Sequence, residues 1–124
     1  MPSQTEALKD RTKAFAVRVV KLFRVLPKTP EARVVGAQLL RSGTSVASNY
    51  RAVCRARSKA EFIAKIGVVV EEADETVFWL ELLIEAEVVV ANRLGPLLAE
   101  ANELLAIFAA SQRTAKLGGG SVRK

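Results

Sequence analysis

A row of polar side chains near the middle of the sequence is the feature best suited to chemistry. Gln38, Ser42, Ser45 and Asn49 follow one another at spacings of four, three and four residues, with Arg41 beside them. This spacing puts them on one face of a helix, at positions usually occupied by apolar residues. Each of these polar atoms needs a partner if it is buried, because an unpaired one costs roughly 1–3 kcal/mol.

Carboxylates on a later segment are the expected partners of this row. We expect Glu72 and Glu75 to accept hydrogen bonds from Arg41, Gln38 and Asn49. We favour a structural interpretation, in which the small residues of this row let two helices approach and its polar atoms fix their register. A ligand site is the alternative. The polar seam, as we call this set, comprises Gln38, Arg41, Ser42, Ser45, Asn49 and Glu75.

Nothing else in the sequence predicts catalysis or metal binding. The chain has no histidine, and so lacks the commonest general base and the commonest metal ligand. The carboxylates between Glu71 and Glu75 have no histidine to complete a di-metal site. Cys54 lies among arginines without a base, which favours a small packing residue. We therefore expect no catalytic residue, no metal, no cofactor and no enzymatic activity.

The cations are concentrated in the first half of the chain. Residues 1–57 carry twelve Lys or Arg and three Asp or Glu, whereas residues 58–110 carry three and ten. A basic half can contact phosphates of RNA or DNA, an interaction that is independent of sequence and sensitive to salt. A solvated helix face, or attraction to the acidic half, is the alternative. The candidate nucleic-acid-binding residues are Arg11, Lys13, Arg18, Lys21, Arg24, Lys28, Arg51, Arg55 and Arg57.

A group of large apolar residues interrupts an otherwise acidic stretch. Phe78, Trp79 and Leu82 stand beside a stripe that includes Glu71, Asp74, Glu81 and Glu85. Aromatic residues in such a position are more typical of an interface than of a solvated surface. We predict an oligomer interface here, with core packing of Trp79 as the alternative.

Four helices must position these residues. Helical periodicity and breakers predict helices at about 5–26, 30–57, 58–86 and 91–116. Pro27 and Pro30 separate the first two, and Ser58 with Glu61 forms a capping box before the third. Gly36 and Gly43 inside the second helix indicate a close helix approach or a bend, with a break near Gly43 as the less favoured alternative.

Short connections between long amphipathic helices favour an all-α fold, an antiparallel up-down-up-down four-helix bundle over residues 1–117. Residues 118–124 are predicted to form a flexible basic tail. The chain has 124 residues, half of them apolar, which is enough for one domain with its own core. No unbroken apolar run approaches the ~18 residues of a membrane span. The single cysteine and the lack of a visible secretory leader favour the cytoplasm.

Several segments together resemble a known family. Residues 38–50 read QLLRSGTSVASNY, residues 57–63 read RSKAEFI, and Glu75, residues 100–104 and residues 111–116 continue the pattern. This pattern is similar to that of the bundle proteins encoded in intervening sequences of bacterial 23S ribosomal RNA genes. Many relatives have a Glu-Gly pair where this chain has Ala52 and Val53.

The resemblance implies a ring-shaped homo-oligomer, typically a homopentamer. It also implies kinship with the accessory bundle protein of diversity-generating retroelements, which binds nucleic acid and a reverse transcriptase. A non-enzymatic oligomer that binds RNA or DNA is therefore the first hypothesis. A structural or adapter oligomer with a protein partner, such as a reverse transcriptase, and without nucleic-acid binding is the alternative. Neither involves a membrane.

Overall fold

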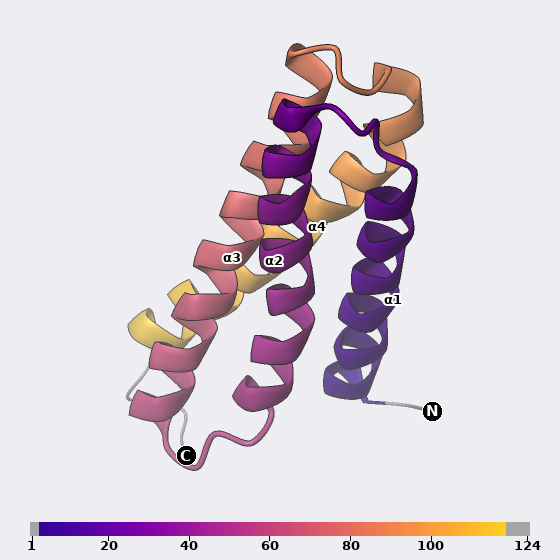
Figure 1. The fold of residues 1–124 in the computed structure, drawn as a ribbon. Helices are drawn as coiled ribbons and strands as arrows, with labels where there is room; N and C mark the ends of the chain where they lie inside the picture. The colour runs from indigo at the N-terminus through magenta and orange to yellow at the C-terminus, as the bar shows by residue number, and fades with distance from the viewer. Residues whose placement is uncertain (1–2, 119–124) are drawn as a thin grey trace.

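A computed structural model describes residues 3–118 of the chain. It contains four helices: α1 (Gln4–Val25), α2 (Pro30–Val53), α3 (Lys59–Glu85) and α4 (Ala91–Leu117). Each helix packs on the next, and within residues 3–118 there is no strand (Figure 1). The predicted all-α four-helix bundle is confirmed. The tail predicted from residue 118 onward lies, except for Gly118, outside the described residues.

Side-chain caps set where the helices begin. Thr29 accepts a hydrogen bond from the Ala32 amide at 3.3 Å, and Pro30 occupies the first position of α2. Ser58 accepts from the Glu61 amide at 3.0 Å, and the Glu61 carboxylate accepts from the Arg57 amide at 2.7 Å. The predicted serine cap is therefore confirmed, whereas the reciprocal bond of the predicted capping box is wrong, because the Glu61 carboxylate accepts from the amide of Arg57, one residue before the cap.

The second helix is shorter than the sequence indicates. It ends at Val53, whereas the prediction extends to residue 57. The Arg55 and Ala56 amides donate to the carbonyls of Ala52 and Val53, three residues earlier. These tight turns reverse the chain before the cap of α3, and helical periodicity alone does not reveal such a reversal.

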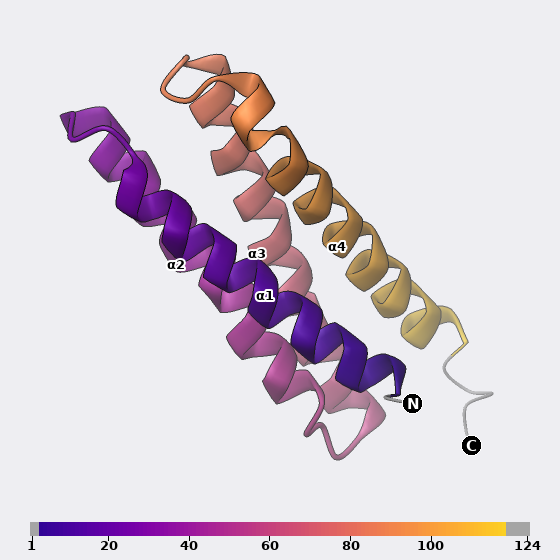
Figure 2. The ribbon, with the colours of Figure 1, turned by 90° about the vertical axis from the view of Figure 1, so that its right-hand side faces the viewer.

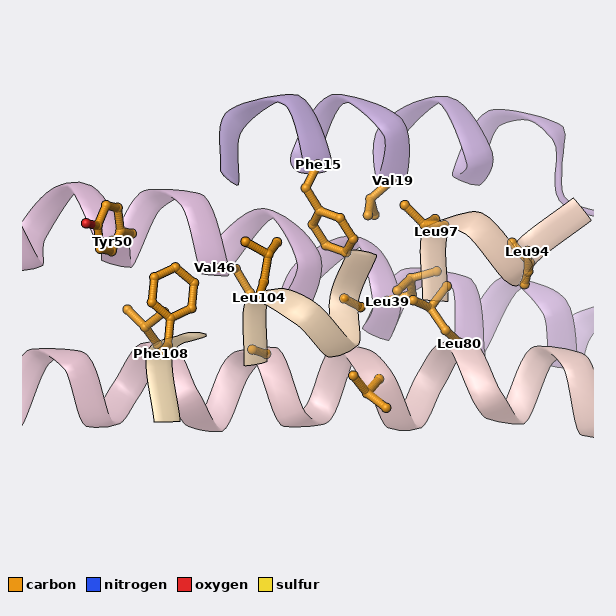
Figure 3. Packing of buried hydrophobic residues seen from close by; sticks show 14 of the residues in the cluster. Phe15, Val19, Leu39, Val46, Tyr50, Leu80, Leu94, Leu97, Leu104 and Phe108 are labelled. Carbon is orange, nitrogen blue, oxygen red and sulfur yellow. The ribbon is translucent and has the colours of Figure 1, made fainter. Parts of the chain in front are cut away.

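One apolar core joins all four helices. Phe15 and Val19 of α1 point toward Leu39 and Val46 of α2, and Leu104 of α4 lies against them (Figure 3). Phe15, Val19, Leu39 and Leu104 are each at most 2% exposed. At about 1.5–3 kcal/mol for each fully buried large apolar side chain, this core is the main source of stability.

Close approach of α1 and α2 explains the glycine at position 43. A Cβ atom at Gly43 would lie 3.0 Å from one methyl group of Val19 and 3.1 Å from the other. At Gly36 it would lie 2.6 Å from Leu26 Cδ1. The helix continues through both positions, so the prediction of a close approach is confirmed and the alternative of a break near Gly43 is wrong.

The first and last helices diverge. The start of α1, the α2–α3 connection and the end of α4 lie at the same end of the bundle, which we call the α2–α3 end (Figures 1 and 2). Among the four packed helix pairs, α1 and α4 have the smallest contact. A groove of about 860 Å³ opens between them at this end, with Leu8, Tyr50, Phe62 and Ile107 in its lining. The sequence does not reveal this opening.

The fourth helix contains one long stretch of high hydropathy with few charges. One 18-residue window of α4 reaches a mean hydropathy of 1.2, with 28% of the window buried. By length and composition alone, α4 is thus apolar enough to cross a membrane, although the sequence contains no long unbroken apolar run. A core helix of a soluble protein meets the same criterion, and α4 contributes Leu94, Leu104 and Phe108 to the core.

Candidate functional site

The exposed part of the polar seam is an ion-pair cluster between α2 and α3. Arg41 Nη1 donates to Glu72 at 3.1 Å, Arg41 Nη2 donates to Glu75, and Arg41 Nε donates to Gln38 at 3.4 Å. Glu75 also accepts from Trp79 Nε1 at 3.0 Å. Hydrogen bonds from Arg41 and then Trp79 hold the pKa of the Glu75 carboxyl below its ordinary value. The hydrogen bond from Arg41 to Glu75 and, to a lesser extent, the one to Glu72 raise the pKa of Arg41.

Ser42, the buried member of the seam, pairs with Thr76 of α3, which was not predicted as its partner. Ser42 and Thr76 are at most 1% exposed, and their oxygens lie 2.9 Å apart. Thr76 also lies 2.7 Å from the Glu72 carbonyl oxygen, and Ser42 lies 3.4 Å from that of Leu39. These short side chains let α2 and α3 pack closely while every hydroxyl keeps an acceptor.

The prediction for the seam is thus partly right. Arg41 does meet Glu72 and Glu75, but Gln38 bonds to Arg41 and not to an acid. Asn49 donates to the Ser45 carbonyl oxygen of its own helix at 2.9 Å. The half-buried Asn49 amide reaches this acceptor one turn back in its own helix, without a partner from a second helix. Arg41, Ser42 and Asn49 donate to carboxylates, to Gln38 or to backbone carbonyls, which fits the role of fixing helix register. Within residues 3–118 the Ser45 hydroxyl and the Gln38 amide group donate no hydrogen bond.

One predicted phosphate-binding residue has an internal partner. Arg11 of α1 donates to both oxygens of Glu100 at 2.7 and 2.8 Å, and to Glu103 at 2.6 Å. The hydrogen bonds to Glu100 and Glu103 raise the pKa of Arg11. The hydrogen bond from Arg11 lowers the pKa of Glu100, and the positive charge of Arg18 lowers it further. Arg11 therefore joins α1 to α4 where the two helices diverge, and we remove it from the candidate nucleic-acid-binding residues.

The other eight candidates are exposed and form no ion pair within residues 3–118. They form two groups. The α1 stripe follows the outer face of α1 and the connection after it, and comprises Lys13, Arg18, Lys21, Arg24 and Lys28. The arginine cluster, which lies at the α2–α3 end, comprises Arg51, Arg55 and Arg57. Because α1 is 22 residues long, much of the α1 stripe is distant from this cluster.

The predicted interface residues differ in their exposure. Phe78 is 51% exposed and meets Trp79 edge-on, with ring centroids 4.9 Å apart. Trp79 is half-buried and packs against the core of its own chain, which supports the alternative interpretation for this residue. Leu82 is also half-buried. Phe78 is therefore the strongest of the three candidates for contact with another molecule.

Cys54 packs against the core, as the favoured interpretation predicts. Cys54 is half-buried at the C-cap of α2, close to Tyr50. Burial, followed by the proximity of Cys54, raises the pKa of Tyr50 to about 12. The Tyr50 ring packs against Phe108 with centroids 5.1 Å apart. Among residues 3–118, no group of three or more His, Cys, Asp or Glu side chains could hold a metal ion.

Comparison with known proteins agrees with the resemblance seen in the sequence. The model of a family described as "23S rRNA-intervening sequence protein" matches residues 6–110. The chain belongs to this family. A similar solved structure is that of a protein with unknown function from the S23 ribosomal protein family of Bacteroides thetaiotaomicron. It is 34% identical with a TM-score of 0.82, and the match covers 90% of this chain and all of the other. No curated protein matches.

For this member of the 23S rRNA-intervening sequence protein family, the solved structure of the relative agrees with the four-helix fold over 90% of the chain. That relative is described as having an unknown function and so assigns none to this chain. The function must therefore be argued from the surfaces described above.

Proposed function

We propose that this family member is a non-enzymatic, cytoplasmic homo-oligomer that binds RNA or DNA through its phosphates. Eight exposed cations, those of the α1 stripe and the arginine cluster, form no ion pair within residues 3–118 and carry the proposal. Those that self-association leaves uncovered are available to phosphate groups. Phosphate groups are the natural partners, because guanidinium and ammonium groups bind them with charge-assisted hydrogen bonds.

Complementary faces on α1 and α3 support self-association. The α1 stripe is interrupted by Val17 and Val25, which are 46% and 63% exposed. The outer face of α3 is acidic and is interrupted by Val68 and Phe78, which are 41% and 51% exposed. One face is the opposite of the other in charge, and both carry exposed apolar groups. Head-to-tail contact between two different faces produces a closed ring when the rotation allows it. A ring of five is the number that the family resemblance implies.

A titration of the wild-type protein with labelled RNA and DNA tests nucleic-acid binding. Fluorescence anisotropy with a structured RNA and a duplex DNA should show binding at low salt for at least one probe. If six phosphates are contacted, affinity for duplex DNA falls by roughly 1,500–2,000-fold between 50 and 200 mM salt. No binding to either probe at low salt would refute the proposal, and binding that salt does not weaken would refute phosphate contact as its basis.

Light scattering tests the oligomer. A mass several times that of the 13.4 kDa chain supports self-association, and a monomer at micromolar concentration contradicts it. A structural or adapter oligomer with a protein partner remains the second candidate. It is favoured by the exposed apolar groups within the α1 stripe, since they indicate that a protein covers this stripe. An oligomer of the expected mass that binds neither RNA nor DNA would select the adapter.

A further inference from the structure

The two groups of cations differ in their surroundings, and this difference suggests two different roles. The α1 stripe contains the exposed side chains of Val17 and Val25. The arginine cluster borders a hollow of about 410 Å³, lined by Ala52, Arg55, Arg57, Glu61 and Lys65. None of the strongly exposed large apolar side chains of the described residues lies in that lining. The hollow has the polar, cationic character of a phosphate site, whereas the α1 stripe resembles a protein interface.

The charge within the hollow is available to a ligand. Glu61 is its only acid, and one carboxylate oxygen of Glu61 accepts from the Arg57 amide at 2.7 Å. The other lies 3.7 Å from Lys65 Nζ. Neither Arg55 nor Arg57 has a side-chain partner within residues 3–118. Two guanidinium groups are therefore free to bind an anion, and each can hold two phosphate oxygens at once.

Helix electrostatics do not account for the position of Arg57. Arg51 lies in the last turn of α2, where a cation stabilises the negative end of the helix dipole. Arg57 and Lys59 flank the Ser58 cap, at the positive end of α3. A cation there is unfavourable by roughly 0.3–1 kcal/mol. Folding gains nothing from the charge of Arg57, but a bound phosphate would gain from both the guanidinium group and the helix end.

We propose that the hollow between Arg55, Arg57 and Lys65 is the phosphate-binding site of this protein, and that the α1 stripe is covered by a neighbouring subunit. This inference rests on the proposed function and narrows it. In any ring with cyclic symmetry, one copy of the hollow from each subunit lies on a circle. A nucleic-acid backbone can then contact several copies, which strengthens binding without a strong single site.

Three double variants with the same change in net charge test the inference. Arg55→Gln/Arg57→Gln removes the free guanidinium groups of the hollow. Lys21→Gln/Arg24→Gln changes the α1 stripe. Arg33→Gln/Arg93→Gln is the matched control, because both arginines are exposed near the starts of α2 and α4, at the opposite end of the bundle (Figure 1). All six side chains are exposed and form no ion pair with the part of the chain that the structure describes. Circular dichroism verifies that each variant keeps its helix content.

Binding to the RNA and the duplex DNA, and the mass in solution, are measured for each variant. Loss of two phosphate contacts lowers the affinity for duplex DNA roughly 60-fold at 0.1 M salt and the salt slope by about 2. We expect this loss in Arg55→Gln/Arg57→Gln at unchanged mass, a fall in mass in Lys21→Gln/Arg24→Gln, and neither change in the control. The RNA and DNA arms show which nucleic acid supplies the phosphates.

The failure of this inference differs from the failure of the proposed function. If the wild-type protein binds nucleic acid and Arg55→Gln/Arg57→Gln binds as the control does, the hollow is not the site, although nucleic-acid binding stands. If Lys21→Gln/Arg24→Gln loses affinity while its mass stays unchanged, the α1 stripe contacts phosphate and the division of roles is wrong. If the wild-type protein binds neither probe, the proposed function itself fails.

Discussion

The close contact between α1 and α2 gives the sharpest prediction for stability, at Gly43. Replacing a glycine by alanine inside a helix normally stabilises it by about 1 kcal/mol. At Gly43 the added methyl group would lie 3.0–3.4 Å from three atoms of Val19, which is fully buried and has a stiff branched side chain. Overpacking of this kind costs about 1–3 kcal/mol. We therefore expect Gly43→Ala to lower the free energy of unfolding by up to about 2 kcal/mol.

Gly95 provides a control away from this contact, because apart from its chain neighbours no side chain lies within 4 Å of the position that its Cβ would occupy. Gly95→Ala should raise the free energy of unfolding by up to about 1 kcal/mol, reduced by the crowding of its Cβ against the ring of Pro96. The two variants then differ by up to about 3 kcal/mol, most of which is the steric cost at Gly43. Urea unfolding followed by circular dichroism measures this difference, at one protein concentration because self-association affects stability.

A third variant isolates the contact itself. In a Val19→Ala background the branched side chain is gone, and Gly43→Ala should then stabilise the protein as Gly95→Ala does. If Gly43→Ala already stabilises the wild-type protein as much as Gly95→Ala, then α1 does not approach α2 at this position, and the packing described above is incorrect.

Three further predictions concern polar contacts and assembly. Ser42→Ala and Thr76→Val should each destabilise by about 1 kcal/mol, and the double variant by less than the sum, because each single variant already loses the bond between the two hydroxyl groups. An additive result would contradict this bond. Arg11→Met should cost about 1 kcal/mol at pH 7. Folding lowers the pKa of Glu100, so this contribution is present above the ordinary carboxyl pKa and is lost as the pH falls through the lowered value; unfolding at pH 7 and pH 3 checks it. Phe78→Ala should weaken self-association about 10-fold or more with unchanged helix content, and an unchanged mass on dilution would exclude this residue from the interface.

Periodicity and local capping made the helices predictable. The starts of α2 and α3 depend on Thr29 and Ser58, which act on residues three positions later, so their effect is visible in the sequence. The end of α2 is different. Val53 is the last residue of the helix because the chain must reverse before α3, and nothing local to residues 54–57 forbids another helical turn.

In the candidate sites, too, the contacts between consecutive helices were predictable and those that depend on the complete fold were not. Arg41 could be matched to Glu72 and Glu75 because α2 and α3 are consecutive and antiparallel, which fixes their register approximately. Arg11 could not be matched to Glu100, 89 residues later, because that pairing depends on how α4 closes the bundle. The hollow of the arginine cluster is likewise a product of the tight turns after Val53, which the prediction of a longer helix did not contain.

The cations of α1 cannot serve two partners at the same time. The stripe extends roughly 17 Å along α1 from Lys13 to Arg24, and the acidic face extends roughly 21 Å along α3 from Glu71 to Glu85, so the acidic face is long enough to cover the stripe. A ring that joins the two faces would neutralise the α1 stripe and bury its exposed valines. On this proposal phosphate binding depends on Arg55 and Arg57, which lie at the α2–α3 end and form no ion pair within residues 3–118. A fully assembled protein that binds DNA with a steep salt dependence, and loses that binding in Arg55→Gln/Arg57→Gln, would place the phosphates at that end.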